Sequence, residues 1–375
     1  MTIPHVDVAV VGAGIVGLAH ALAAARRGYK VALFERTNPA VGASIRNFGQ
    51  VWPVGKTGSA FQLAMKSREI WIELSERVGL YCLENGSLHL AYEDDEMAVL
   101  EEFYHSIPEA QEYCELLEPD AVLKKSPAVK PQGLKGALWS TTELNLDPRQ
   151  AIRRIPEWLH ETYGIELYFG VHVNQIVMPY IETTAGRWQA ERVFVCSGSD
   201  FETLYPIEYR QTGIMRCKLQ MLRTAPQPEG WKLGPNLCAG LTMVHYGYFS
   251  HCPSFPKLQA RMDDQFPFYR QHHIHLLLSQ TSLGELTIGD HHEYGQTFEP
   301  FDREDINQAM LRYLMSFASA PTFEIAERWH GIYPLVKGHS EIVLHPEPNV
   351  TIINGLGGSG MTRSFGLAEQ VLSQI

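Results

Sequence analysis

The sequence has no excess of positive charge. Its 42 acidic residues outnumber its 31 lysines and arginines, which gives a formal net charge of −11. A general basic surface of the kind that holds nucleic acid or an anionic membrane is therefore excluded. A local basic pocket for a small anion is compatible with this average, because it needs only one or two well-placed cations.

Cysteines are few and lie far apart. They form no C-x-x-C pair, and such scatter favours reduced thiols in a cytoplasmic protein over a disulfide framework or a zinc site. The six are Cys82, Cys114, Cys196, Cys217, Cys238 and Cys252.

Long hydrophobic runs are also missing. The apolar stretch 6–25 includes Asp7 and runs directly into a glycine motif, so a buried strand and helix explain it better than a signal peptide. No other stretch approaches the length that a membrane-spanning helix needs. We therefore expect no membrane partner.

The first 35 residues have the pattern of a β-α-β unit that binds a dinucleotide. Gly12, Gly14 and Gly17 form G-x-G-x-x-G between an apolar strand and an alanine-rich helix, the context that gives this motif its meaning. Glu35 ends the next strand, close to the spacing of about 20 residues at which a carboxylate binds the adenosine ribose. It would repel a 2′-phosphate, which argues against NADP. The alternative is a glycine-rich turn in an unrelated βα unit.

A second glycine cluster lies at the other end of the chain, in residues 354–362. It follows a predicted strand at 349–354 and precedes the last helix. A nicotinamide enzyme needs only one such turn, whereas FAD extends past its pyrophosphate and needs a second close approach to the backbone. A helix N-terminus aimed at the flavin would also stabilise the anion formed on reduction. The cluster therefore favours FAD over NAD, the alternative being a flexible C-terminal loop.

The remaining patterns predict an α/β fold with a Rossmann-like FAD-binding domain and a second α+β substrate domain built on an antiparallel sheet. We expect helices at 58–78, 94–118, 148–163 and 302–317, a hairpin at 80–92, and strands at 166–173, 192–196, 246–250 and 272–280. The FAD-binding domain is assigned residues 1–85, 145–212 and 325–375. The substrate domain is assigned residues 86–144 and 213–324.

With these motifs in view, the chain resembles the glycine oxidase, D-amino-acid oxidase and sarcosine oxidase superfamily of FAD enzymes along nearly its whole length. Four stretches carry the resemblance: the first glycine motif with Glu35, Gly42–Gly49, Arg328–Gly331, and the C-terminal glycine cluster. More narrowly, 44–54 and 284–295 are similar to a bacterial subgroup linked to aminophosphonate breakdown.

The resemblance implies a set of FAD contacts. The segment at Ser44–Asn47 wraps the pyrophosphate and ribityl side, while the segments at His172–Val173 and Ser197–Gly198 lie against the adenosine. Together with the two glycine turns, the expected FAD-binding residues are Gly12, Gly14, Ile15, Val16, Gly17, Glu35, Arg36, Ser44, Arg46, Asn47, His172, Val173, Ser197, Gly198, Gly355, Gly357, Gly358, Ser359, Gly360, Met361 and Thr362.

The chain also departs from its relatives. No cysteine flanks the C-terminal glycine cluster, so the covalent flavin link of some sarcosine oxidases is not expected and FAD is predicted to bind non-covalently. Val336-Lys337-Gly338-His339 replaces the usual acidic turn, which puts a transferred substrate geometry in doubt.

Amine oxidation by a flavin requires little acid–base machinery, because the cofactor accepts the hydride. The protein must orient the substrate and place a positive charge where oxygen is reduced. We therefore look for cations and aromatic walls, each weighed against an ordinary surface or core role. The predicted catalytic residues are Arg46, Lys218, Trp329, His330 and Lys337, and the predicted substrate-binding residues are Trp52, Tyr246, Tyr248, His273, His275 and Tyr333.

Nine of the 16 histidines fall between positions 245 and 339. They suit a phosphonate or carboxylate pocket, although each one taken alone is more often a surface or core residue. No metal site is expected, because no carboxylate or cysteine completes a ligand set at useful spacing.

The sequence thus predicts an enzyme that oxidises the C–N bond of a small primary or secondary amine with an anionic tail, with O2 as acceptor and H2O2 as product. Two alternatives remain open. One is an amine dehydrogenase that passes electrons to a carrier, and the other is a flavin-binding protein without turnover.

Overall fold

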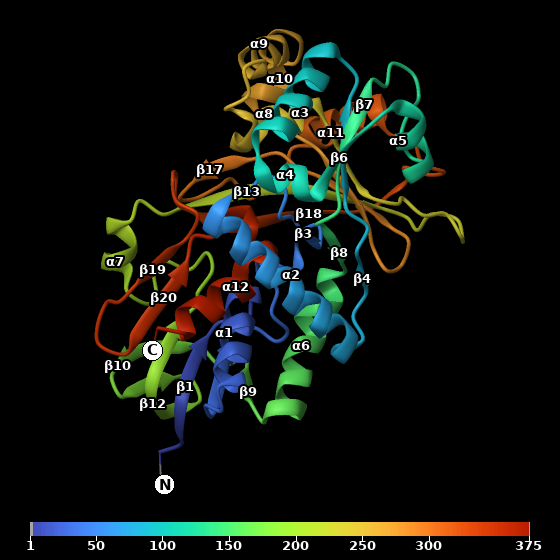
Figure 1. Ribbon diagram of the computed structural model, residues 1–375. Helices are drawn as coiled ribbons and strands as arrows, with labels where there is room; N and C mark the ends of the chain where they lie inside the picture. The colour runs from blue at the N-terminus through green and yellow to red at the C-terminus, as the bar shows by residue number, and fades with distance from the viewer. Residues whose placement is uncertain (1–2, 375) are drawn as a thin grey trace.

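The computed structural model describes residues 3–374 of the chain. Two large β-sheets form its frame, and a small three-stranded sheet lies beside them. In Figure 1 the helices α1, α6 and α12 lie in the lower half of the view, and α3, α5, α9 and α11 lie in the upper half. Across the described residues, no helix is both long and apolar enough to cross a membrane.

The first sheet has a parallel centre, as the β-α-β pattern predicts. Strands β9, β2, β1, β12 and β20 lie side by side in that order and run parallel. Strands β10, β11 and β19 add antiparallel edges. The bounds are β1 His5–Val11, β2 Val31–Glu35, β9 Glu166–Phe169, β10 Val173–Val177, β11 Tyr180–Thr183, β12 Gly186–Val195, β19 Ile342–Leu344 and β20 Val350–Asn354.

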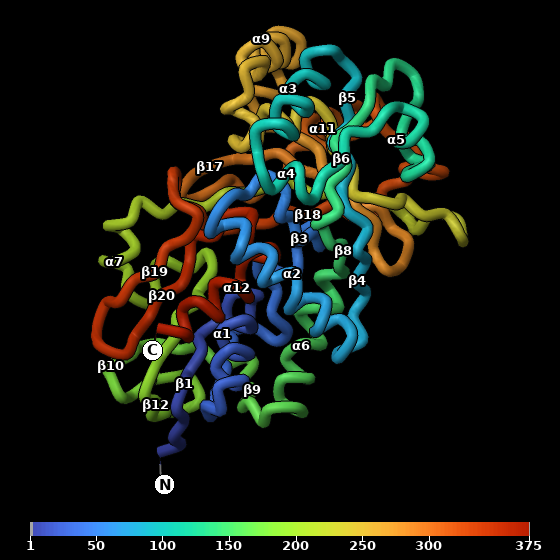
Figure 2. Tube along the Cα trace, in the orientation of Figure 1, coloured from blue at the N-terminus to red at the C-terminus, as the bar shows by residue number. Residues whose placement is uncertain are grey.

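Helices from both ends of the chain cover this sheet. Helix α12 packs against α1 and α2, so the red C-terminal end of the trace in Figure 2 returns to the blue N-terminal end. Trp71 in α2 is fully buried, lies edge-on to Phe365 in α12 and donates a hydrogen bond to the Met361 carbonyl at 2.8 Å. The bounds are α1 Ile15–Arg26, α2 Gly58–Val78, α6 Pro148–Tyr163, α7 Pro206–Gln211 and α12 Gly360–Leu372.

The second sheet is antiparallel except where β14 and β5 pair in parallel. Its order is β17-β13-β16-β15-β14-β5-β7-β6, and the long strand β18 pairs with β13. The bounds are β5 Ser87–Ala91, β6 Cys114–Leu117, β7 Gly136–Ser140, β13 Met215–Thr224, β14 Asn236–Ala239, β15 Leu277–Gln280, β16 Leu286–Gly289, β17 Glu293–Gly295 and β18 Ile325–Leu335.

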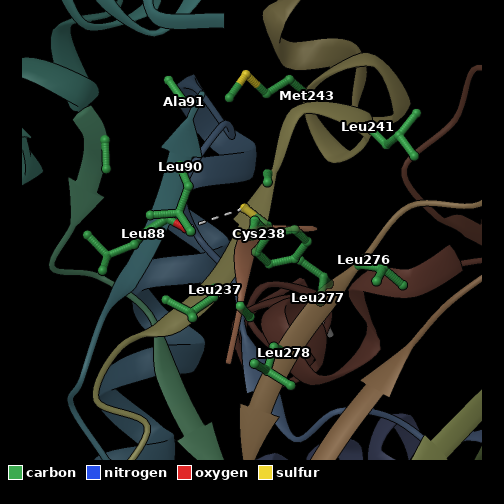
Figure 3. Packing of buried hydrophobic residues seen from close by; sticks show 14 of the residues in the cluster. Leu88, Leu90, Ala91, Leu237, Cys238, Leu241, Met243, Leu276, Leu277 and Leu278 are labelled. Atoms are coloured by element: carbon green, nitrogen blue, oxygen red, sulfur yellow. Dashed lines mark hydrogen bonds between the residues drawn. The ribbon is translucent and has the colours of Figure 1, made fainter. Parts of the chain in front are cut away.

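One face of the second sheet builds the largest hydrophobic core. Figure 3 shows Leu88 and Leu90 of β5 beside Cys238 of β14 and Leu277 of β15. Helices from the middle of the chain supply the rest of this core. Their bounds are α3 Asp94–Ser106, α4 Pro108–Tyr113, α5 Pro119–Lys125, α8 Gly240–His245, α9 Phe255–Gln265, α10 Pro267–Gln271 and α11 Glu304–Phe317, with the 3-10 turn η2 at Gly247–Phe249.

The α/β class and the parallel and antiparallel sheets are confirmed, but several local predictions are wrong. The hairpin expected at 80–92 does not form, because β4 (Cys82–Leu83) pairs with β8 (Leu144–Leu146) in the small sheet while β5 joins the second sheet. The small sheet is completed by β3 (Gln50–Val51). Tertiary pairing decides the partner of a short strand, and local alternation does not report it.

Four further segments differ from expectation. The strand predicted at 166–173 ends at Phe169, and the next strand, β10, begins at Val173. Residues 246–250 form a turn and η2 instead of a strand, and 114–117 form a strand instead of helix. In the stretch 272–280 only the last four residues are a strand. His273 lies in a turn with a positive φ of 48°, which is outside the extended β region of regular strands.

The two-domain division remains a proposal, and its outermost positions 1, 2 and 375 lie outside the described residues. Strands of the first sheet come from the segments assigned to FAD binding. Strand β18 also comes from one of those segments, but it pairs with β13 in the second sheet, so it ties the two sheets together.

Replacement of Gly366 by alanine should destabilise the protein. An added Cβ would lie 2.2 Å from the backbone oxygen of Leu63 where α12 crosses α2, and backbone cannot move aside cheaply. Overpacking of this kind costs about 1–3 kcal/mol, so the melting temperature should fall by several degrees. Gly247→Ala, whose methyl group would meet nothing within 4 Å, is the control and should melt like the wild type. Equal melting of both variants would contradict this close helix crossing.

Candidate active site

Two cavities of about 410 Å³ and about 330 Å³ meet between the sheets. The first, called the nucleotide cavity, lies over the carboxyl ends of β1, β2, β12 and β20. The second, called the inner cavity, lies between the C-terminal glycine cluster and the second sheet. The residues that border both are Ile15, Ala43, Ser44, Arg46, Tyr333, Gly357 and Gly360. Together they form one long site suited to an extended ligand.

The first glycine motif shapes the floor of the nucleotide cavity. Gly12 has a φ of 103°, and a Cβ there would lie 2.4 Å from the Cys196 carbonyl oxygen. Gly17 does not border the cavity; a Cβ on it would strike the Gly12 oxygen at 1.8 Å. Gly12 therefore allows the tight turn, and Gly17 allows the helix to pack on it. The N-terminus of α1, which favours an anion, is left open to the cavity.

Glu35 lies on the same cavity wall, at the end of β2. Its Oε2 accepts a hydrogen bond from the Ala13 amide at 2.9 Å, and its Oε1 accepts bonds from the amide and hydroxyl of Thr37 at 2.9 and 2.7 Å. These bonds hold the carboxylate beside the glycine turn. Arg36, also on the wall, forms an ion pair with Asp200 at 2.8 Å.

The C-terminal glycine cluster borders the inner cavity. Gly355 and Gly357 have φ values of 70° and 59°, so the backbone turns sharply between β20 and the helix α12. The short 3-10 turn η3 (Gly357–Ser359) leads into α12, whose first residues face the cavity. The Thr362 hydroxyl accepts a hydrogen bond from the Trp52 amide at 2.9 Å. This bond fixes Trp52 in the wall of the inner cavity.

The sequence-predicted FAD-binding residues line these cavities with two exceptions, Gly17 and Gly355, which lie behind the turns. Three features fit a dinucleotide that carries a further ring system. They are glycines at positions where a side chain would not fit, a carboxylate at the ribose end, and two open helix N-termini. The donor set and the length of the site therefore fit FAD.

Arg46 borders both cavities. Its Nε donates to the Val41 carbonyl at 2.8 Å, and its Nη1 donates to the His330 carbonyl at 3.0 Å. Trp329 in turn donates from its indole nitrogen to the Arg46 carbonyl at 2.9 Å. Strand β18 therefore fixes the loop that carries Arg46.

Trp329 and His330 do not border either cavity among the residues described. The His330 ring faces Asp302, with Nδ1 3.0 Å from a carboxylate oxygen. These two predicted catalytic residues therefore contact the loop that carries Arg46 and lie outside both cavities.

The predicted oxygen-activating lysines also lie outside both cavities. Lys218 is 2% exposed, and its ammonium donates to the carbonyls of Glu299 and Phe301 and pairs with Asp302 at 3.1 Å. Lys337 is exposed on the turn after β18. Side chains alternate along a strand, and Lys218 points to the face away from the site, which the sequence could not reveal.

The predicted substrate wall is only partly assembled. Trp52, Tyr246 and Tyr333 border the inner cavity, whereas Tyr248 lies behind Tyr246, with ring centroids 5.4 Å apart. His275 is buried behind the wall, and His273 is exposed on its turn. The strand predicted at 272–280 would place His273 and His275 on one face, because side chains alternate along a strand. This prediction is wrong, because neither residue is in a strand.

Lys56 is a cavity residue that the sequence analysis missed. It follows the turn at Gly55 and is half-buried in the wall of the inner cavity. Burial, together with the positive charge of Arg363, lowers the pKa of Lys56 to about 8, although Glu143 opposes the shift. Among the described residues, the lysine and arginine side chains that border this cavity are those of Lys56 and Arg46.

His245, Asp290 and His292 also border the inner cavity and were not selected from the sequence as site residues. A sequence signal did exist, since Asp290-His291-His292 places three polar groups in a strand-rich, apolar region. Their distance in sequence from His245 concealed the cluster.

Replacement of Arg46 by alanine should weaken FAD retention. The variant loses a cation at the junction of the cavities and the hydrogen bonds that hold the loop to Val41 and His330. Charge-assisted hydrogen bonds contribute about 1.5–3 kcal/mol each, so the dissociation constant of FAD should rise at least about tenfold in a flavin fluorescence titration. Arg46→Lys should recover little of this, since one ammonium cannot reach both carbonyls in the same geometry. Unchanged FAD affinity in both variants would show that this loop does not support the cofactor.

Comparison with known proteins supports this geometry. Residues 7–374 match the family model described as DAO, FAD dependent oxidoreductase. Glycine oxidase of Geobacillus kaustophilus (strain HTA426) is 27% identical over 206 residues, which cover 52% of this chain and 54% of that protein. The match therefore spans about half the length of this relative.

Solved structures match over nearly the whole chain. L-Proline dehydrogenase from P. horikoshii has a TM-score of 0.80 at 19% identity and covers 99% of this chain and 93% of its own. The G. kaustophilus glycine oxidase structure has a TM-score of 0.76 at 20% identity, with 99% and 94% covered. At these identities the likeness shows a shared fold. The family match over almost every residue shows more: this chain is an enzyme of the DAO family of FAD-dependent oxidoreductases.

Proposed function

We propose that this enzyme oxidises the C–N bond of a small primary or secondary amine with an anionic tail, with O2 as electron acceptor and H2O2 as product. The observation that carries the proposal is the inner cavity, where Arg46 and Lys56 lie among aromatic walls and adjoin the nucleotide cavity. A cavity of about 330 Å³ suits a small molecule.

The residues of the inner cavity bind and orient the substrate. FAD, when bound, supplies the hydride acceptor for the oxidation. Lys56 is cationic below a pH of about 8 and can pair with a carboxylate or phosphonate. Trp52, Tyr246 and Tyr333 exclude water from the substrate and restrict its orientation, which is how positioning lowers a reaction barrier.

The names of the matched proteins support the substrate class. Glycine and L-proline, named in those proteins, are a primary and a secondary amine with a carboxylate tail. An aminophosphonate is the narrower candidate, which rests on the sequence resemblance of 44–54 and 284–295. We also retain a cytoplasmic location as part of the proposal, since all six cysteines are free thiols.

The purified protein should be yellow and should turn over amines in air. We expect H2O2 release with at least one of glycine, sarcosine, D-amino acids, 2-aminoethylphosphonate or its N-methyl form, measured in a peroxidase-coupled assay. Glycerol 3-phosphate, an anionic alcohol without an amine, is the negative control. The same amine should bleach the flavin absorbance without air, and air should restore it.

The other outcomes separate the alternatives. Anaerobic bleaching with slow recovery in air but rapid reduction of an artificial dye would replace the oxidase with a dehydrogenase. No bleaching by any amine would overturn amine oxidation, and activity on carboxylates alone would remove the aminophosphonate candidate.

Lys56→Gln should weaken binding of the anionic tail. Acetate, which has no amine to titrate, can be followed by its perturbation of the flavin spectrum. In the wild type the ammonium is present below a pH of about 8, so acetate affinity should be highest there and fall as the pH rises through about 8. The variant should lose this pH dependence and bind acetate about tenfold more weakly near pH 7, the loss of one charge-assisted bond.

Lys337→Gln is the matched control. It removes an equal charge from an exposed position outside the inner cavity, so its acetate affinity and pH profile should match the wild type. If the Lys56→Gln variant keeps the wild-type pH profile of acetate binding, another group binds the anionic tail.

A further inference from the structure

Four metal-ligating side chains converge on the wall of the inner cavity. They are His245 at the end of α8, His275 before β15, and Asp290 and His292 between β16 and β17. The ring nitrogens of the three histidines lie within 4.8 Å of one another. No metal site is expected from the sequence, but the fold brings Asp290 among these histidines.

The carboxylate of Asp290 lies between two of the imidazoles. Its Oδ1 is 3.0 Å from Nε2 of His275, and its Oδ2 is 3.3 Å from Nε2 of His292. Oxygen and nitrogen ligands about 2.0–2.2 Å from one zinc ion in a tetrahedral arrangement are separated by a little over 3 Å, so these spacings suit a shared cation.

The cluster is buried and only partly hydrogen-bonded. His275 is 1% exposed and Asp290 is 4% exposed. His292 contacts the hydroxyls of Tyr294 and Tyr333 at 3.0 and 3.5 Å, whereas within residues 3–374 Nδ1 of His275 has no hydrogen-bond partner. A buried polar atom without a partner costs about 1–3 kcal/mol, and a bound cation would satisfy ligand atoms that converge in this way.

We propose that His245, His275, His292 and Asp290 form a binding site for a divalent transition-metal ion such as Zn²⁺. Imidazole and carboxylate ligands select metals of this kind over the hard, oxygen-preferring Mg²⁺ and Ca²⁺. His245 stacks on His275 with ring centroids 3.7 Å apart, so it must turn to complete the set. It is the half-buried member of the cluster and borders the inner cavity.

The site opens toward the substrate. His245, Asp290 and His292 all border the inner cavity, so a bound ion would face it. A divalent ion with one carboxylate ligand retains a net positive charge and would attract the anionic tail of a substrate. This last consequence rests on the proposed function, whereas the metal site does not.

The test is zinc binding by the FAD-loaded, untagged protein after treatment with a chelator. Isothermal titration with ZnCl2, checked by elemental analysis after dialysis, should show one tightly bound equivalent. His292→Gln and Asp290→Asn should each weaken binding at least roughly 100-fold, since loss even of a supporting group around a metal costs 10–100-fold. His273→Asn, which removes an exposed neighbouring imidazole and tolerates the positive φ, is the control and should bind zinc like the wild type.

Flavin content and thermal melting show which variants are folded. Should the buried variants fail to fold, His245→Asn at the half-buried position tests the same site. No zinc bound by the folded wild type, or equal affinity in the wild type and the folded ligand variants, would overturn the proposal. Because binding is measured without turnover, zinc binding by an enzyme that oxidises no amine would leave the metal site standing and overturn only the proposed function.

Discussion

The site depends on one contact between the two ends of the chain. Strand β20 pairs with β12, β12 pairs with β1, and α12 packs on α1, so two glycine turns more than 300 residues apart open onto one continuous site. Each turn is shaped by steric limits, because Gly12 cannot carry a side chain beside Cys196 and Gly357 adopts a positive φ. The hydrophobic burial of α1, α2 and α12 holds the turns at this separation.

A second set of interactions joins this nucleotide region to the second sheet. The Ile15 amide donates to the Ser44 hydroxyl at 2.9 Å, and two residues later Arg46 donates to the His330 carbonyl on β18. Trp329 returns a hydrogen bond to the Arg46 carbonyl. The loop 42–49 therefore connects the helix end that favours an anion with the strand that borders the inner cavity. Residues outside both cavities, such as Trp329, support the site through this loop.

The inner cavity combines opposite charges in a small volume. Arg46 and Lys56 supply positive charge, while Asp290 supplies a buried negative charge surrounded by imidazoles. A small molecule with both an amine and an acid group is suited to such a cavity, and a metal ion is suited to its imidazole wall. The nucleotide region is common to a whole family, so the particular chemistry of this enzyme lies in the inner cavity.

The sequence by itself determined the cofactor, the α/β fold, and the two glycine turns and the carboxylate of Glu35 that shape the site. Those features depend on glycine spacing, helical and strand periodicity and a carboxylate at a strand end, all of which are local patterns. Only the tertiary structure decided which cations border the inner cavity, because Lys218 and Lys56 look alike in sequence but point to different sides of the fold. It also decided the partners of β4 and β5 and the meeting of His245 with Asp290. The physical reason is the same in each case: these contacts join residues distant in the chain, and long-range packing, not local pattern, sets their geometry.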